Sequence, residues 1–187
     1  MSISPPPSLV FASTSPQRRA ILEQLGIPFE VAAPLYDERG DDPVEHAVGK
    51  ARSVWSDRPV LGIDTAVVCR GLVYGKPADA AAAERMLAEL AGRTHEVVSG
   101  LCLRTSAWEE KHREVTLVTF RPLSPRDVTA YVAGGEWEGR ADAYAIQGRG
   151  AALVERIEGD YLNVVGLPAA LLVRLLVSRF PGAYGFG

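Results

Sequence analysis

The sequence predicts an α/β fold in which helices flank a mixed β-sheet. Short apolar runs bounded by turn residues, which are typical of strands, alternate with segments whose apolar residues recur at helical spacing. Some neighbouring strand candidates are joined by a tight turn and others by a whole helix. Hairpins give antiparallel neighbours and helical crossovers give parallel ones. The pattern therefore favours a mixed sheet over a doubly wound parallel sheet.

Composition limits the classes of protein to which the chain can belong. Its 187 residues, 47% hydrophobic and 23% charged, suffice for one compact unit or two small lobes. The net charge of -3 argues against general affinity for nucleic acid or anionic membranes. No apolar run reaches the roughly 18 residues that span a bilayer, and no signal peptide is indicated at the start. We expect a cytoplasmic protein with Cys69 and Cys102 as buried free thiols.

The first half of the predicted domain alternates strands and helices. We expect a flexible Pro- and Ser-rich arm over residues 1–8, a single domain over 9–180 and a flexible Gly-rich tail over 181–187. The expected elements are a strand from Leu9, a helix from Ser15 to Gly26, a strand over 29–33, a helix over 43–56, a hairpin over 60–69 and 72–76 and a helix over 79–92.

The second half is predicted to add a long strand pair and two further helices. The strands cover residues 94–105 and 113–123, and they should close in a polar turn around residues 109–111. A capping box predicts a helix starting at Ser124. Residues 151–166 are interpreted as another strand pair, and residues 167–180 as a final helix with an apolar face.

The first predicted helix carries Arg18 and Arg19 in its first turn, where the partial positive charge of the helix N-terminus disfavours cations. Ser15 can cap this helix, and its N–H groups point outward with serines and arginines around them. Such an arrangement is typical of an anion site, and phosphate is the commonest anion that it binds. A capped helix with two solvated arginines is the alternative.

Asp64 is the most unusual polar residue, because its neighbours in the predicted strand are apolar or small. A carboxylate there is costly unless it is paired, hydrogen-bonded or bound to a metal. A turn at residues 70–71 places Asp64 opposite Pro77. The same register places Thr65 opposite Lys76, so Asp64 and Lys76 become diagonal neighbours. The two charges face a substrate or metal, or they form a structural ion pair.

Two further polar residues are weaker candidates. Lys50 lies just outside the edge of an apolar helix face, which favours an ordinary snorkelling lysine over a functional cation. Gln147 precedes two glycines, and these residues alone favour a surface glutamine of a Gly-rich bulge over a ligand contact. The stretch "GLVYGKP" lacks the spacing of a P-loop. No histidine has a partner at the spacing of a Ser-His or Cys-His system.

Seven motifs in order resemble the Maf family of nucleoside triphosphate pyrophosphatases, over Leu9 to about Leu176. They are "LVFASTSPQRRAILEQLGIPFEV", "GIDTAVV", "GKP", "AGRTHEVVSG", "FRPLS", "AYAIQGRGA" and "GDYLNVVGLP". The resemblance implies a highly twisted sheet related to that of the inosine triphosphatase group, two lobes with a cleft, and a homodimer. It also implies cleavage of a nucleoside triphosphate between the α and β phosphates with a divalent metal cation, Mg²⁺ or Mn²⁺.

The family's functional positions have matching residues in this sequence. They are Ser13, Ser15, Arg18 and Arg19 in the phosphate loop, Glu38 and Asp64 toward the metal, Lys50, Asp64 and Lys76 in catalysis, and Thr65 and Gln147 toward the substrate. We expect Asp64 to hold the metal or to take the proton from a water. The cations Arg18, Lys50 and Lys76 would stabilise charge on the phosphates.

One departure affects the predicted substrate. Gln17 stands where many members have the first of two arginines, and this "STSPxRR" form resembles the subfamily that acts on N7-methyl-GTP. The stretch "YAIQGRGA" resembles instead the subfamily that acts on dTTP and UTP. We expect Gln147 to lie nearer the base, so dTTP and UTP are preferred. A regulator of cell division that holds a nucleotide without turnover is the alternative from another class.

Overall fold

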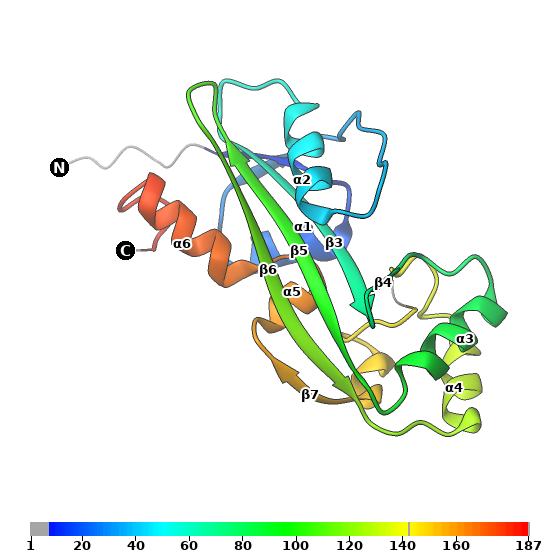
Figure 1. Cartoon of the computed structure of the whole chain (residues 1–187). Coiled ribbons are helices and arrows are strands. Elements are labelled where there is room, and N and C mark those ends of the chain that lie inside the picture. Colours follow the sequence, from blue (N-terminus) through cyan, green and yellow to red (C-terminus); the bar gives the residue numbers. More distant parts are fainter. Residues whose placement is uncertain (1–7, 142, 187) are drawn as a thin grey trace. The chain divides into compact units, whose positions relative to one another are not determined.

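The computed structural model describes residues 8–141 and 143–186, and it contains a sheet of 7 strands with helices around it (Figure 1). The strand order is β2-β1-β3-β5-β6-β7, with β4 paired to β3. The strands are β1 (Leu9–Ala12), β2 (Phe29–Val31), β3 (Val60–Cys69), β4 (Leu72–Tyr74), β5 (Thr94–Arg104), β6 (Glu109–Phe120) and β7 (Val154–Glu158). The helices are α1 (Pro16–Gln24), α2 (Pro43–Arg52), α3 (Ala80–Leu90), α4 (Pro125–Val132), the 3-10 helix η1 (Arg149–Leu153), α5 (Tyr161–Val165) and α6 (Ala169–Arg179).

The sheet is mixed, as the sequence predicts. β1 runs parallel to both β2 and β3, whereas β3 and β4 are antiparallel, as are β6 and β7. The predicted caps are also confirmed: Ser15, Asp79 and Ser124 each accept a hydrogen bond from a backbone N–H in the first turn of their helix. Both cysteines are buried free thiols, as predicted. In the described residues no helix is long and apolar enough to cross a membrane.

Two predicted elements are wrong. The turn of the long strand pair lies at residues 105–108, where the Thr105 N–H donates to the Trp108 carbonyl at 2.8 Å, and residues 109–111 belong to β6. Residues 151–166 hold only one strand, β7, flanked by η1 and α5. The second strand is replaced by a helix because the Asp160 carboxylate accepts from the Leu162 N–H, and the buried Asn163 amide donates to Val97 O and Thr116 Oγ1.

The chain divides into two compact units, each built from separated stretches of sequence. The first unit contains the chain up to Asp64, residues Ser99–Glu114, and the chain from Gly166 onward. The second unit contains Thr65–Val98 and Val115–Val165. The prediction of one domain over 9–180 stays a prediction. The flexibility predicted for residues 1–7 and for residue 187 lies outside the described residues; within the predicted tail, Tyr184 is buried and packs on the ring of Phe180.

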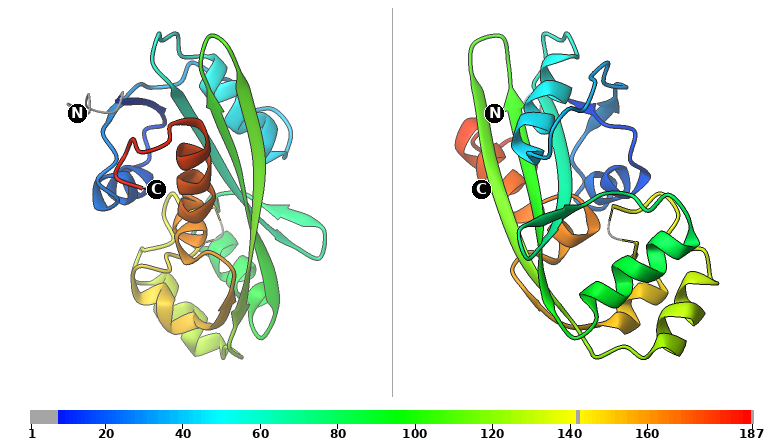
Figure 2. Two further views of the ribbon diagram at one scale, coloured as in Figure 1. Left: turned by 90° about the vertical axis from the view of Figure 1, so that its left-hand side faces the viewer. Right: turned by 45° about the vertical axis from the view of Figure 1, so that its right-hand side comes forward.

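In the first unit, α2 and α6 cover opposite faces of the β5–β6 hairpin (Figure 2). Alternating residues of β6 face the two helices, as the period of a strand requires. Glu109 and Lys111 pair with Arg52 and Glu45 of α2, whereas Glu110 and Glu114 pair with Arg179 and Arg174 of α6. The polar run that suggested a turn is therefore a strand whose charges pair on both sides.

The close approach of α2 to the sheet depends on two glycines. A Cβ on Gly62 of β3 would lie 2.2 Å from the Ala47 carbonyl oxygen, and one on Gly100 of β5 would lie 2.1 Å from the Pro43 carbonyl oxygen. No side chain fits at these distances. The helix backbone therefore rests directly on the two strands, and this contact fixes the position of Lys50 and its neighbours on α2.

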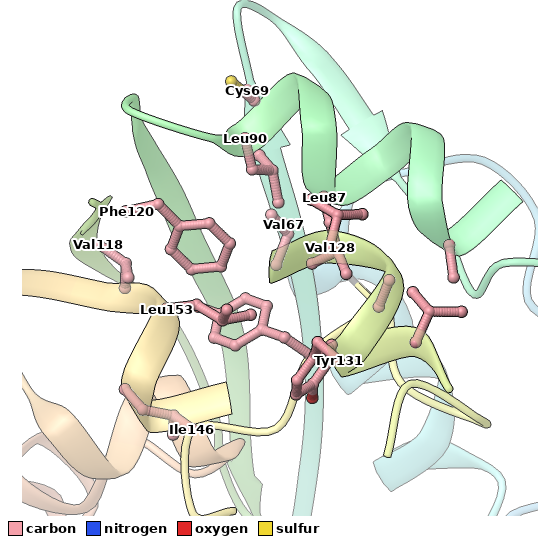
Figure 3. Close-up of a cluster of buried hydrophobic side chains, with 14 of the residues drawn as sticks. Val67, Cys69, Leu87, Leu90, Val118, Phe120, Val128, Tyr131, Ile146 and Leu153 are labelled. Carbon is pink, nitrogen blue, oxygen red and sulfur yellow. The ribbon is translucent and has the colours of Figure 1, made fainter. Parts of the chain in front are cut away.

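The second unit has its own apolar core between α3, α4 and the strands (Figure 3). Leu87 and Leu90 of α3 and Val128 and Tyr131 of α4 point into one cluster with Phe120 of β6. His95 lies at the edge of this core, only 1% exposed, with its ring against those of Phe120 and Tyr144. Burial lowers the pKa of His95 to about 4.

The buried His95 makes the stability of the fold sensitive to pH. The unfolded chain binds a proton on this histidine near pH 6.5, whereas the folded chain binds it only near pH 4. The contribution of His95 to the free energy of unfolding is therefore at its maximum above pH 6.5, and it decreases as the pH drops toward 4. We expect a loss of up to roughly 3 kcal/mol from this group. Urea denaturation of the wild type and of His95→Gln at pH 7 and 4.5 measures it. Equal losses in both proteins would contradict the assignment.

Candidate active site

The N-terminus of α1 is arranged as the sequence predicts. Ser15 has an extended backbone and caps the helix by accepting from the Arg18 N–H at 3.5 Å, and Pro16 occupies the first helical position. Ser13 is buried, and its Oγ accepts from the Ser15 N–H at 3.2 Å. Two predicted phosphate-loop serines therefore lie together immediately before the helix.

The two adjacent arginines have different roles in the structure. Arg18 donates from Nε to the Gly166 carbonyl at 2.8 Å and from Nη1 to the Ile63 carbonyl at 2.9 Å. Arg19 is exposed and pairs with Glu23, one turn further along α1, at 2.8 Å. The structure thus ties Arg18 to the middle of β3, next to Asp64, and it places Arg19 on the solvent face of its own helix.

Lys50 lies between two carboxylates. Its Nζ is 2.6 Å from Oε1 of Glu38 and 2.6 Å from Oδ1 of Asp64. The Lys50 side chain is 11% exposed and that of Asp64 17%, whereas that of Glu38 is 53% exposed. The three residues come from α2, from the loop before it and from β3, so they meet only in the folded chain.

Arg18 belongs to the same electrostatic cluster. Burial lowers the pKa of its guanidinium, and the charges of Asp64 and Glu38 partly offset this effect by raising it. Two cations and two anions from positions 18, 38, 50 and 64 therefore form one neutral group, which we call the charged cluster. All four belong to the first unit. Partly buried charges are tolerated here because each has an opposite charge nearby.

The carboxylates of the charged cluster fit a divalent cation. Since both contact the Lys50 ammonium at 2.6 Å, their oxygens lie within about 5 Å of each other. Mg²⁺ is typically held by one or two carboxylates together with waters and substrate phosphates, not by a complete protein cage. In keeping with this, no group of three or more acidic, histidine or cysteine ligands gathers within the described residues.

The remaining predicted site residues belong to the second unit. Thr65 follows Asp64 in β3 and is partly buried, Lys76 is exposed just after β4, and Gln147 is exposed just before η1. The predicted hairpin register holds from Cys69 opposite Leu72 to Val67 opposite Tyr74. The pairing ends there, because β4 stops at Tyr74. Lys76 therefore lies beyond the paired residues, and its predicted place beside Asp64 stays a prediction.

Gly166 is a site residue that sequence reasoning did not find. Its carbonyl accepts from Arg18, and its φ of 129° is a conformation that favours glycine. The motif "GDYLNVVGLP" contained it, but a backbone acceptor leaves no signature in side-chain chemistry. The same holds for the Ile63 carbonyl, which is the second acceptor.

Together, the fold and the site define an α/β protein in which two cations and two carboxylates gather beside the N-terminus of α1. The model of the Maf family, described as Maf-like protein, matches residues 8–179, and the chain belongs to this family.

The sequence similarity to related proteins extends over most of both chains. A protein of Symbiobacterium thermophilum is 48% identical over 180 residues, which cover 91% of this chain and 93% of the relative. One of Gloeobacter violaceus is 46% identical, covering 91% and 95%, and one of Deinococcus radiodurans is 42% identical, covering 96% of each. All three bear the name dTTP/UTP pyrophosphatase.

The two arginines should respond differently to the same substitution. Arg18→Lys should lower the free energy of unfolding by about 2 kcal/mol, because an ammonium does not reproduce the guanidinium fork that reaches two carbonyls. Arg19→Lys should change it by less than about 0.5 kcal/mol, since exposed pairs contribute little. Urea denaturation compares them, and equal effects would contradict the placement of Arg18.

Proposed function

We propose that this protein is a nucleoside triphosphate pyrophosphatase that hydrolyses dTTP and UTP to the monophosphate and pyrophosphate. One observation carries the proposal. Four residues that match functional positions of the family lie far apart in the sequence but meet in the charged cluster: Arg18, Glu38, Lys50 and Asp64. Relatives at 42–49% identity named dTTP/UTP pyrophosphatase support it. We further propose a cytoplasmic homodimer without affinity for nucleic acid or membranes.

The residues of the cluster have different roles in the hydrolysis of the triphosphate. The N-terminus of α1 and Arg18 bind phosphate oxygens, and the cations of the cluster stabilise the charge that builds on them. A water oxygen forms a bond to the α phosphorus, and the bond from that phosphorus to the bridging oxygen breaks. Pyrophosphate leaves with that oxygen, and Asp64 takes the proton of the water.

Lys50 changes partners during this cycle. In the structure its ammonium joins Glu38 and Asp64, the same carboxylates that would hold Mg²⁺ or Mn²⁺. The bound cation would neutralise phosphate charge and acidify the water. Lys50 has a flexible four-carbon stem, so its ammonium can then turn to the phosphates without leaving the cluster. Until then it holds the two carboxylates close together.

A binding module without turnover is the second candidate. Retention of a nucleotide calls for the anion site at α1, but it gives no reason for a partly buried Asp64 beside a lysine. The N7-methyl-GTP subfamily remains the alternative within the enzyme class, because of Gln17. Both candidates are tested by the same screen over nucleotides.

Asp64 carries the chemical step in this proposal. With Mg²⁺ or Mn²⁺, the wild type should release pyrophosphate from dTTP and UTP faster than from CTP, ATP, GTP or N7-methyl-GTP. Asp64→Asn should lower kcat by about a thousandfold or more, because it removes both the proton acceptor and a charge at the metal position. Chromatography of the products and a circular dichroism spectrum check activity and folding. Near-normal turnover by the folded variant would overturn the role of Asp64, and no pyrophosphate from the wild type would favour the binding module.

Gln147 should decide base preference more than rate. Gln147→Ala should reduce the ratio of kcat/KM for dTTP over CTP by about tenfold, because an amide that reads a base edge discriminates through hydrogen bonds. The kcat for dTTP should stay within about threefold. Gln24→Ala, at the exposed end of α1, is the matched control and should leave the ratio unchanged. An unchanged ratio in Gln147→Ala would remove Gln147 from base selection.

A further inference from the structure

The loop that carries Glu38 is fastened to α2 by three contacts, which we call the loop clasp. The ring of Tyr36 lies against Gly49, the carboxylate of Glu38 contacts the ammonium of Lys50 at 2.6 Å, and the carbonyl of Gly40 accepts from Nε2 of His46 at 3.1 Å. Glu38 thus forms the middle contact of the three. The other two involve none of the predicted site residues.

The spacing on both sides explains why the contacts form together. His46, Gly49 and Lys50 stand at i, i+3 and i+4 of α2, so they share one face of the helix. The loop contributes the ring of Tyr36, the carboxylate of Glu38 and the carbonyl of Gly40, so Glu38 has a fastened residue two positions away on each side. Displacing either outer contact therefore moves the residue between them.

Gly49 provides the space for one outer contact. A Cβ at this position would lie 2.1 Å from Cε2 of Tyr36 and 2.3 Å from its Cζ, so the ring occupies the place of a side chain. Gly inside a helix costs roughly 0.5–1 kcal/mol relative to Ala. The close seating of Tyr36 gives the reason for a glycine here. The same ring stands perpendicular to the His46 ring, with centroids 5.9 Å apart.

His46 provides the other outer contact. It is 5% exposed, and since its Nε2 faces the oxygen of Gly40, that nitrogen carries the proton. The buried Nδ1 is without a hydrogen-bond partner in the described part of the chain. The contacts of His46 to Gly40 and Tyr36 offset the cost of burying this unsatisfied nitrogen.

We propose that Tyr36, His46 and Gly49 are positioning residues that hold the Glu38 carboxylate in the charged cluster and so set the affinity for the divalent cation. The binding of a divalent cation rests on the proposed function, whereas the fastening of the loop to α2 does not. Residues that orient a metal ligand from behind typically change metal affinity 10–100-fold when they are substituted.

Gly49→Ala in the full-length protein tests the clasp. Hydrogen exchange of peptides covering residues 33–42 should accelerate at least tenfold, because the added methyl displaces the ring of Tyr36. The Kd for Mn²⁺, followed by its electron paramagnetic resonance signal, should rise about tenfold. The Mg²⁺ concentration for half-maximal pyrophosphate release should rise similarly, with kcat at saturating Mg²⁺ within about threefold.

Other variants separate positioning from general damage. Tyr36→Ala should reproduce the effects without touching the helix, and Tyr36→Phe, which keeps the ring, should stay close to the wild type. The double variant Tyr36→Ala with Gly49→Ala should regain stability through helix propensity but retain the weak Mn²⁺ binding. Glu45→Ala removes an exposed carboxylate of α2 that pairs with Lys111 of β6, and it should leave loop exchange and Mn²⁺ binding unchanged.

The outcomes distinguish this proposal from the proposed function. Unchanged loop exchange in both Gly49→Ala and Tyr36→Ala would overturn the clasp, as would faster exchange with unchanged Mn²⁺ affinity. If the wild type releases no pyrophosphate but the variants loosen the loop and weaken Mn²⁺ binding, the clasp stands and the pyrophosphatase assignment fails.

Discussion

The ammonium of Lys50 between two carboxylates is the interaction on which the site depends. Asp64 lies in the apolar run of β3, where an isolated carboxylate would be costly, and Lys50 lies on α2, whose backbone rests on glycines of β3 and β5. The pair therefore requires the close packing of this helix on the strands. Glu38 adds a second carboxylate from a loop, and that loop is itself fastened to the same helix. The charged cluster therefore forms only when α2, its preceding loop and the strands of the first unit pack together.

Charge balance explains how a cluster of partly buried charges can be stable. With Arg18 and Lys50 facing Asp64 and Glu38, no single charge is left without an opposite one. In the proposed reaction a triphosphate and a divalent cation would bring charges of both signs, so they could replace the internal partners without leaving a buried charge alone. Glu38 is the more exposed of the carboxylates, which makes it the one that can exchange partners most easily.

The sequence allowed the mixed sheet, the caps and the candidate residues to be predicted, because apolar periodicity, capping residues and motif order are local signals. Hairpin register was predicted correctly as far as pairing extends, but where β4 ends depends on packing that no local signal reports. The turn was misplaced since charged β6 residues resemble a loop until Arg52 and Arg179 are known to pair with them. The role of the Gly166 carbonyl as an acceptor and the buried contacts of His46 could not be predicted either, because only the folded chain brings these partners together.

The adjacent arginines of "STSPQRR" show how helix geometry sorts identical side chains. Successive residues of a helix point about 100° apart, so adjacent arginines can meet different surroundings. Arg18 is three and four residues before the buried Ile21 and Leu22, and it shares their face; Arg19 shares the solvent face of Glu23. Gln17 accepts at Oε1 from the Ser15 hydroxyl at 3.2 Å, so it stays with the cap. A shift of the arginine pair by one position therefore still leaves one guanidinium at Asp64, because the core-facing stripe of α1 selects the arginine that enters the site.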